Sequence, residues 1–333
     1  MSSRPAAHGR DVAIADEDFE QYRRELNAYC YRMLGSAFET DDAVQETMVR
    51  AWRSSGSFEG RSTVRSWLYR IATNVCIDMR QSPQRRARPM DLGPSGRTDS
   101  FAGVTRPGEA WLEPIPDSWV LSENGDPAEL VAIRESVQLA FVAALQYLPA
   151  RQRAVLILRE VLRWSALEVA TLLDTTVVSV NSALQRARST LAARVPASRQ
   201  IDEQDEQVLD VDRLQLIARY VDAFERYDVV ALVALLRDDV VMSMPPYDFW
   251  LEGPVEVGRW FLGPGSHCRG SRLVATAANG CSAFGSYSPD PAGGHAPWAL
   301  QVIEVSDGRI VGHHNFLDTR LFAKFGLPAH LDG

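Results

Sequence analysis

The chain has 333 residues, of which 46% are hydrophobic and 23% are charged, so it is long enough for two or three globular domains and too apolar to be disordered throughout. Its formal net charge of −8 at pH 7, from 43 acidic and 35 basic residues, argues at first sight against a nucleic-acid partner. Lys324 is the single lysine, however, and the other 34 basic residues are arginines, which suit bidentate phosphate and guanine contacts, although a GC-rich genome gives the same bias.

Cysteine usage and hydropathy exclude several classes of protein. The four cysteines are Cys30, Cys76, Cys268 and Cys281. They have neither CxxC nor Cys/His ligand spacing, so the sequence predicts no zinc site and no disulfide framework. The N-terminal segment lacks the apolar core of a signal peptide, and the longest uncharged run, residues 273–289, is too rich in Asn, Gly and Ser to span a membrane. We therefore expect a cytoplasmic protein without metal, cofactor or membrane partner.

The charge is distributed unevenly along the chain. Residues 1–49 carry a net charge of −5, residues 50–88 of +7, residues 89–150 of −6 and residues 151–196 of +4. The remaining 137 residues, with 11 basic and 19 acidic side chains, account for the whole −8. Two basic bands separated by an acidic spacer predict two contact surfaces for a polyanion.

Hydrophobic periodicity and Gly/Pro content predict three globular blocks. The expected boundaries are 1–15 for a flexible N-terminus, 16–90 for a first helical domain, 91–127 for a linker, 128–196 for a second helical domain, 197–211 for an acidic hinge and 212–333 for an α+β domain. The linker has no periodicity and is longer than compact domains usually tolerate.

The first basic band contains two predicted helices separated by the loop 58–63. The helix over 41–53 has an apolar arc formed by Val44, Met48, Ala51 and Trp52. The helix over 64–81 has an apolar arc formed by Trp67, Leu68, Ile71, Ala72, Val75 and Met79. Its opposite face carries Arg70, Asn74 and Gln81, and Arg80, Arg85, Arg86 and Arg88 follow at its end. A solvated helix face gives the same pattern, but arginines clustered on one side are also the expected footprint of phosphate contacts.

The motif DDAVQETMVRAWR is followed by FEGRSTVRSWLYRIATNVCIDMR, and the two together resemble region 2 of the extracytoplasmic-function (ECF) sigma factors. In that family the first helix docks on the clamp of the RNA polymerase β′ subunit, and the loop and second helix hold the melted −10 element. The resemblance implies that core polymerase is bound by Asp41, Asp42, Gln45, Glu46 and Arg50. It implies that the −10 element is bound by Phe58, Arg61, Ser62, Arg70, Asn74, Asp78 and Arg80. Such a surface is physically suitable, because melted DNA needs pockets for exposed bases and cations along its backbone.

The second basic band has the pattern of a helix-turn-helix. Ser165 and Glu168 form an S-x-x-E capping box for a helix that ends near Leu173. The dipeptide 174–175 forms the turn, and Thr176 is the predicted N-cap of a second helix. The inward stripe of that helix is Val180, Leu184, Ala187 and Leu191. Its outer face suits a recognition helix that reads the major groove, although an ordinary αα-hairpin has the same layout.

The opening LPARQRAVLILREV and the ending VNSALQRAR of this band are similar to region 4 of the ECF sigma factors, which binds the −35 element and the polymerase β flap. The resemblance implies that the −35 element is bound by Val178, Ser179, Asn181, Ser182, Gln185, Arg186 and Arg188. Two such matches in chain order, joined by a linker, indicate a sigma factor.

The C-terminal block is predicted to form helices followed by a strongly bent antiparallel sheet, which is an α+β roll. A first amphipathic helix is marked by Leu214, Ile217, Val221 and Phe224. The elements expected after it are a helix over 229–236, a strand over 238–244 stopped by Pro245-Pro246, a helix over 253–261, and strands over 272–277, 281–287, 298–305 and 309–317. Ser306-Asp307-Gly308 is a hairpin signal between the last two strands.

The motif YVDAFERYDVVALVALLRDDVVMSMPP resembles the SnoaL-like domains of the nuclear transport factor 2 superfamily, which form a cone with a pocket. The resemblance implies a regulatory domain that acts in place of a separate anti-sigma factor, with Trp250, Trp298 and His313 as a candidate pocket for a small-molecule ligand. Stand-alone relatives include polyketide cyclases that use Asp and His, for which the candidates are His313, His314 and Asp318. Neighbouring residues of a strand point to opposite faces, so at most one of the two histidines faces the pocket, and we do not predict catalysis.

The function expected from the sequence is that of a sigma factor, not an enzyme, with core RNA polymerase and promoter DNA as partners. Two alternatives remain at this stage. One is a ligand-responsive helix-turn-helix regulator that acts without core polymerase, which would not need the helix over 41–53. The other is a fusion enzyme whose C-terminal pocket turns over a small hydrophobic substrate.

Overall fold

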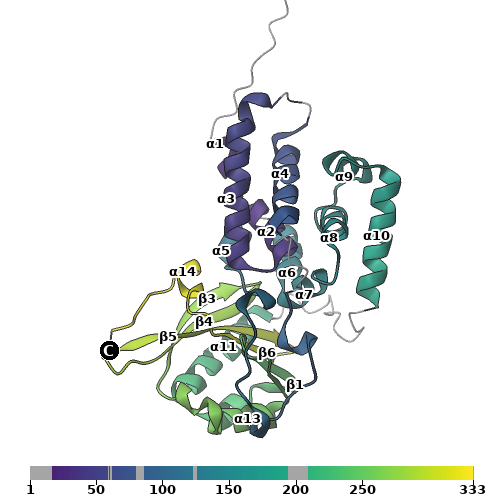
Figure 1. Cartoon of the computed structure of the whole chain (residues 1–333). Coiled ribbons are helices and arrows are strands. Elements are labelled where there is room, and N and C mark those ends of the chain that lie inside the picture. Colours follow the sequence, from purple (N-terminus) through teal and green to yellow (C-terminus); the bar gives the residue numbers. More distant parts are fainter. Residues whose placement is uncertain are drawn as a thin grey trace, which may run out of the picture.

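The computed structural model describes residues 17–58, 60, 62–79, 86–122, 126–193 and 209–332. Two groups of helices stand side by side above a single sheet, whose far face is covered by further helices (Figure 1). No helix in the described part of the chain is both long and apolar enough to cross a membrane. The acidic hinge expected at 197–211 and the N-terminus expected at 1–15 fall almost wholly outside the described residues.

The first helical domain consists of α1 (Glu17–Glu20), α2 (Arg23–Leu34), α3 (Ala37–Ser54) and α4 (Val64–Met79). Ser36 caps α3, because its side chain accepts a hydrogen bond from the amide of Glu39 at 3.2 Å. The apolar arcs of α3 and α4 face a common core, as predicted, except at two ends. Trp52 is 60% exposed and Met79 is 40% exposed, so both lie outside the core that the periodicity assigned to them.

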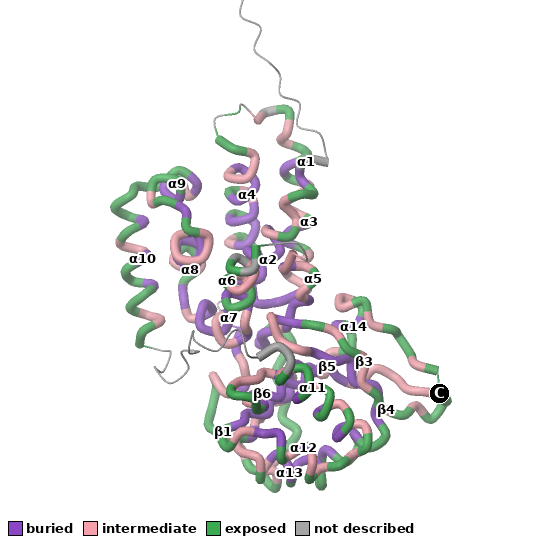
Figure 2. The backbone as a smooth tube through the Cα atoms, turned by 180° about the vertical axis from the view of Figure 1, so that it is seen from behind, coloured by how far each residue is buried: buried purple, intermediate pink, exposed green. Residues whose placement is uncertain are grey.

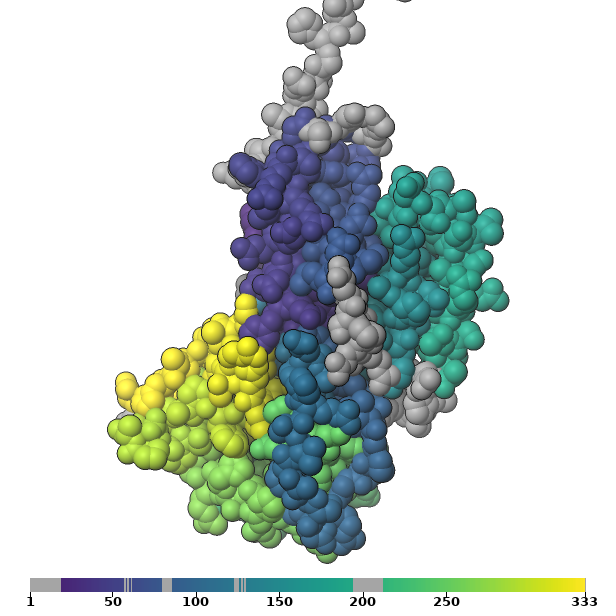
Figure 3. Space-filling view, viewed as in Figure 1, coloured from purple at the N-terminus to yellow at the C-terminus, as the bar shows by residue number. Residues whose placement is uncertain are grey.

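The linker forms short turns that the lack of periodicity did not predict. They are η2 (Pro89–Asp91), η3 (Thr98–Ser100), η4 (Gly108–Ala110) and α5 (Asp117–Val120). Between these turns the linker runs along the surface of the C-terminal domain, as the dark blue atoms over the green ones show (Figure 3). It is therefore a packed part of the structure and contributes to the cores on either side.

The second helical domain contains the predicted helix-turn-helix. Its elements are α6 (Pro127–Val137), α7 (Leu139–Leu145), α8 (Ala150–Leu156), the π-helical turn η5 (Ile157–Val161), α9 (Ala166–Leu172) and α10 (Val177–Ala192). Both bonds of the capping box between Ser165 and Glu168 are present at the start of α9. Thr176 caps α10 by accepting from the amide of Ser179 at 3.1 Å, and Val180, Leu184 and Ala187 are buried as expected.

The C-terminal domain consists of helices packed on one six-stranded sheet. Its helices are α11 (Leu209–Glu225), α12 (Val229–Val233), α13 (Pro254–Leu262), η7 (Pro264–Cys268) and α14 (Leu321–Lys324). Its strands are β1 (Leu236–Ser243), β2 (Trp250–Glu252), β3 (Arg272–Ala278), β4 (Cys281–Pro289), β5 (His295–Ser306) and β6 (Arg309–Phe316). The order in the sheet is β2-β1-β6-β5-β4-β3.

Three details of this domain correct the sequence prediction. The sheet is mixed, because β1 pairs in parallel with β6, the strand that is farthest from it in sequence. The helix expected over 229–236 ends at Val233, since the chain must already be extended where Leu236 opens β1. Leu214 is 69% exposed, because the buried stripe of α11 is centred on Leu216 and Tyr220. The hairpin turn is as predicted, with Asp307 and Gly308 both at positive φ.

The sheet has two buried faces, and alternate residues of β6 serve each of them. His313 and Asn315 point toward α11 and α13, while His314 and Phe316 point toward the helical domains. A cluster of buried apolar side chains crosses that second face and joins α2, the linker and α7 to the sheet. The tube coloured by burial shows the buried segments converging where the helical half meets the sheet (Figure 2). The C-terminal domain is therefore docked through a hydrophobic interface.

Candidate nucleic-acid interfaces and the contacts that cover them

The α3 helix presents most of its predicted contact residues to solvent. Asp42, Gln45 and Arg50 are exposed, whereas Asp41 and Glu46 are half-buried. Glu46 and Arg50 form an ion pair one turn apart at 2.7 Å. Arg50 also lies 3.5 Å from the carboxylate of Asp78 on α4, so the structure joins the polar faces of the two helices.

The α4 helix and the loop before it form a second exposed surface. Arg70, Asn74 and Asp78 lie on the exposed face of α4 at helical spacing, and Ser62 is exposed just before the helix. Phe58 is half-buried, and its ring packs on Trp67 with 5.1 Å between centroids. The predicted contact residues Arg61 and Arg80 lie outside the described residues.

The α10 helix stands at the outer edge of the second helical domain, and its outer side is exposed (Figure 2). The exposed members of its predicted set are Val178, Ser179, Asn181, Gln185, Arg186 and Arg188, while Ser182 is half-buried. Val178 is 75% exposed although it is apolar. Arg188 lies 2.6 Å from Glu160 of η5. The other exposed side chains leave this face open to a ligand.

The two helical domains share one hydrophobic core. Tyr69 of α4 packs on Trp164 before α9 with 5.1 Å between ring centroids, and the guanidinium of Arg65 lies over both rings. Arg153 of α8 is fully buried and donates to the carbonyl of Met33 at the end of α2. Its other bonds go to backbone and side-chain oxygens of 145–148. The domains are therefore joined by apolar packing and by a buried cation that each domain helps to satisfy.

Asn279 in the β3–β4 turn connects the C-terminal domain to three other segments. The residue is fully buried and has φ of +56°. Its Oδ1 accepts from the amide of Ile115 at 3.0 Å, and its Nδ2 donates to the hydroxyl of Tyr31 at 2.7 Å and to the carbonyl of Val137 at 2.6 Å. One side chain thus binds the linker, α2 and α6 at once.

Lys324 on α14 makes a second connection. Its Nζ lies 2.5 Å from Oδ2 of Asp41, at the start of the polar face of α3. The same ammonium lies 5.5 Å from the ring centroid of Phe38 and 5.8 Å from that of Trp119. The C-terminal domain therefore contacts one of the five residues predicted to bind core polymerase.

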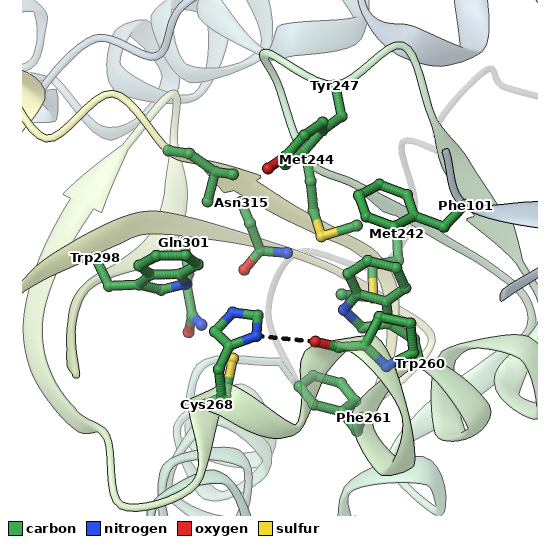
Figure 4. Close-up of a pocket in the computed structure, with 13 residues that line it drawn as sticks. Phe101, Met242, Met244, Tyr247, Trp260, Phe261, Cys268, Trp298, Gln301 and Asn315 are labelled. Atoms are coloured by element: carbon green, nitrogen blue, oxygen red, sulfur yellow. Dashed lines mark hydrogen bonds between the residues drawn. The ribbon is translucent and has the colours of Figure 1, made fainter. Parts of the chain in front are cut away.

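The C-terminal domain contains a cavity of about 80 Å³ between the sheet and α13 (Figure 4). Trp298 lines it, as expected from the sequence, but the other two candidate pocket residues do not. Trp250 faces the linker and donates from its indole nitrogen to the carbonyl of Gly93 at 2.9 Å. His313 lies behind the lining, where its Nε2 is 2.8 Å from the hydroxyl of Tyr220. Burial lowers the pKa of His313 to about 3, with a smaller contribution from the neighbouring His314.

The remaining candidate catalytic residues lie away from the cavity. His314 occupies the opposite face of the sheet, where its Nδ1 is 2.8 Å from Oγ of Ser243. Asp318 pairs with Arg320 at the surface, and this pairing lowers the pKa of its carboxyl against the effect of burial. The two histidines point to opposite faces, as predicted.

Three residues that matter in this arrangement were missed by sequence reasoning. Asn279-Gly280 is a hairpin signal that predicts a turn but says nothing of a partner. Lys324 stood out as the single lysine, yet its position offered no indication of Asp41. Phe101 is an isolated aromatic in an aperiodic linker, and it lines the cavity of the C-terminal domain.

Comparison with known proteins gives matches over both helical domains and over the whole chain. Residues 19–86 match the family described as Sigma-70 region 2, and residues 138–191 match Sigma-70, region 4. The chain is 43% identical over 320 residues to the ECF RNA polymerase sigma factor SigG of Mycobacterium tuberculosis. The aligned residues cover 94% of this chain and 83% of SigG. It is 28% identical over 170 residues to the ECF RNA polymerase sigma factor SigW of Bacillus subtilis, covering 51% of this chain and 82% of SigW.

Among solved structures, the crystal structure of the Mycobacterium tuberculosis extracytoplasmic function sigma factor SigJ is similar in fold. Its TM-score is 0.58 at 21% identity, with 94% of this chain and 100% of that chain covered. The match therefore extends over the helical domains and the C-terminal domain together. The α+β cone expected from the SnoaL-like resemblance is the fold observed after residue 209.

Proposed function

The chain belongs to the ECF sigma factors of RNA polymerase, and from that premise we infer how its surfaces and its C-terminal domain serve transcription initiation. The protein is a sigma factor that binds core RNA polymerase and directs promoter-specific initiation. Its relatives are named as sigma factors and not as enzymes, so the fusion-enzyme alternative is set aside.

We propose that the polar face of α3 binds core polymerase, that α4 with the preceding loop binds the −10 element, and that α10 binds the −35 element. The partners within polymerase are the β′ clamp for the first helical domain and the β flap for the second. This assignment is supported by the exposure of Asp42, Gln45, Asn74 and Gln185, which have no role in the cores. Arginines beside them supply sequence-independent attraction to phosphate.

We further propose that the docked C-terminal domain holds the sigma factor in a closed state that is less active than the undocked one. The −10 and −35 elements lie roughly 70 Å apart if about 20 base pairs separate them at about 3.4 Å each. Helical domains joined by the contact between Tyr69 and Trp164 must separate before each can reach its element. The interface on the second face of the sheet binds α2, the linker and α7 together and therefore opposes that separation.

The single observation that carries this proposal is the ion pair between Lys324 and Asp41. It joins the C-terminal domain to the helix that is proposed to contact polymerase, so core binding and docking would compete. Regulation of this kind acts within one chain, and a separate anti-sigma factor is not required. The cavity of the C-terminal domain gives such a switch a place for a small-molecule signal, and the protein would act in the cytoplasm, where its polymerase is.

Reconstituted transcription tests the proposal. The full chain is added to core polymerase with DNA from upstream of its own gene as template, and transcripts are measured beside core polymerase alone. We expect a specific transcript that depends on the full chain and rises in a Lys324→Ala variant. A protein that bound duplex promoter DNA tightly and did not bind core polymerase would instead be the ligand-responsive helix-turn-helix regulator.

A further inference from the structure

The cavity of the C-terminal domain is closed on one side by the interdomain linker. Its apolar wall is formed by Met242 of β1, by Met244 directly after that strand, and by Trp260 and Phe261 of α13. Phe101, which lies in the linker directly after η3, completes that wall (Figure 4). A residue from outside the domain is thus part of the domain's own pocket.

The ring of Phe101 is surrounded by three other aromatic rings, which we call the aromatic seat. It makes edge-on contacts with Tyr247, Phe249 and Trp260, with ring centroids 5.1, 5.1 and 4.9 Å away. Edge-to-face pairs at such distances are favourable beyond the area they bury. The seat is shaped for this linker, because a Cβ on Gly96 would lie 2.5 Å from the ring of Phe249.

The segment around Phe101, residues 93–106, which we call the strap, is held by hydrogen bonds along its length, including two from the amide and Oγ1 of Thr98 to Oε2 and the carbonyl of Glu256 at 2.9 and 3.0 Å. The amide of Gly96 donates to the carbonyl of Trp250 at 2.8 Å, and the amide of Arg106 donates to the carbonyl of Pro246 at 3.0 Å. Arg106 also pairs with the carboxylate of Asp248 at the surface. Water can replace these hydrogen bonds when the strap lifts, so the half-buried ring of Phe101, with its three aromatic contacts, is the contact that a ligand in the cavity can take over.

The far side of the cavity carries a fixed set of polar atoms. Asn315 donates from Nδ2 to Nδ1 of His313 at 3.0 Å, so the proton of this neutral imidazole is on Nε2, which faces the hydroxyl of Tyr220. That hydroxyl in turn donates to Oε1 of Gln301 at 2.7 Å. The chain of bonds orients both amides and leaves Gln301 Nε2 and Asn315 Oδ1 without a hydrogen-bond partner among the described residues.

The size and lining of the cavity define what it can hold. With Phe101 seated it measures about 80 Å³, less than the roughly 150 Å³ of a cavity that binds benzene. Removing one phenyl ring adds about the missing volume. No carboxylate, guanidinium or ammonium group lines the cavity within the described part of the chain. Its one imidazole, that of His267, already donates from Nδ1 to the carbonyl of Pro264 at 2.9 Å, so the lining favours an uncharged ligand.

From these observations we propose that the cavity binds an uncharged planar ring compound with one hydroxyl or carbonyl group, and that the ligand displaces Phe101 and lifts the strap. The ring takes the place of the phenyl group, and its polar group pairs with Gln301 or Asn315. The ligand and the ring of Phe101 cannot occupy the cavity wall at the same time, so ligand binding favours the state in which the strap is released. This inference rests on the proposed role of the C-terminal domain as a regulator of the helical domains.

The test is a calorimetric titration of the full chain with 2-naphthol, accompanied by hydrogen exchange of the strap amides of Gly96 and Arg106. A Phe101→Ala variant should bind 2-naphthol roughly tenfold more tightly or better, because it no longer competes with three aromatic contacts. The matched control is Val104→Ala, a strap position that is 62% exposed, and it should bind like the native chain. A Gln301→Leu variant should lose preference for 2-naphthol over naphthalene.

In the native chain, saturating 2-naphthol should accelerate exchange at Gly96 and Arg106, a readout that does not depend on any variant folding. Absence of binding to both the native chain and Phe101→Ala would overturn the ligand class. Binding with strap exchange unchanged would overturn the displacement of Phe101. Strap release with unchanged affinity for core polymerase would leave this inference standing and refute the regulatory role proposed for the domain.

Discussion

Replacing Asn279 by glycine should release the C-terminal domain from the helical domains. Glycine keeps the positive φ of +56° without strain, so the variant removes only the side chain and its three hydrogen bonds. While the interface stays closed, the amide of Ile115 and the carbonyl of Val137 lose their buried partner, and the hydroxyl of Tyr31 loses a donor. The first two groups are left unpaired at about 1–3 kcal/mol each, whereas the Tyr31 hydroxyl still donates to the carbonyl of Glu113, so the closed state should lose roughly 2–6 kcal/mol.

When the interface opens, water can form hydrogen bonds with these groups. Part of the free energy that the closed state loses therefore shifts the equilibrium toward the undocked state. At about 1.4 kcal/mol per factor of ten, we expect the undocked population to rise roughly a hundredfold or more. Hydrogen exchange of the amide of Ile115 measures it directly. Pro114 and Pro116 have no amide proton, so a peptide covering 112–116 reports few sites and Ile115 stands out.

The matched control is Asp307→Gly, which removes a side chain at positive φ from another hairpin turn of the same sheet, the one between β5 and β6. Its only ion pair in the described structure is with Arg237 at the surface, 3.1 Å away, so exchange at Ile115 should stay native. If Asn279→Gly also left exchange at Ile115 unchanged while both variants kept the native melting temperature, the role assigned to Asn279 in docking would be refuted.

Three further predictions concern the ion pair at α3, the buried imidazole and the recognition helix. Lys324→Ala should raise affinity for core polymerase by no more than about fivefold in a binding titration, because a half-exposed pair such as Lys324–Asp41 contributes at most about 1 kcal/mol. The control is Arg226→Ala, directly after α11, which removes an exposed ion pair with Asp222 and should show no change. Because burial holds the pKa of His313 near 3, the folded state excludes a proton that the unfolded chain binds below pH 6.5, so the free energy of unfolding falls as the pH drops from 6.5. In urea unfolding, the free energy of unfolding of His313→Gln should depend on pH less steeply than that of the native chain, by up to about 1.4 kcal/mol per pH unit. The same pH dependence in both proteins would contradict this. Arg186→Ala should weaken binding of the polymerase complex to promoter DNA and reduce the slope of log affinity against log salt by about one, whereas an unchanged slope would place this arginine away from phosphate.

Local signals in the sequence predicted the helical part of the fold well. The periodicity of α3 and α4 and the capping residues Ser165 and Thr176 act within a few residues of their positions, so the sequence contains the whole cause of each feature. The ends of amphipathic faces were less predictable. Trp52 continues the apolar arc of α3 near the end of the helix, yet it is 60% exposed.

Features that depend on distant segments could not be derived from local pattern. The parallel pairing of β1 with β6 and the docking of the sheet on α2 join residues far apart in the chain. Trp250 illustrates the effect on the candidate site. Its size and position made it a sensible pocket residue, but the linker lies over it and takes its indole nitrogen as a donor. The aromatic that does complete the pocket, Phe101, comes from that same linker.

The closed arrangement of the two helical domains is tested most directly by a distance measurement between them in the free protein and in its complex with core polymerase. Dyes placed at Arg24→Cys on α2 and Ser189→Cys on α10 occupy exposed positions outside the proposed interfaces. Burial raises the pKa of the Cys268 thiol to about 11 and that of Cys281 to about 12, so these thiols react poorly near pH 7. We predict high energy-transfer efficiency in the free protein and a large decrease on core binding. The same efficiency in both states would contradict the account.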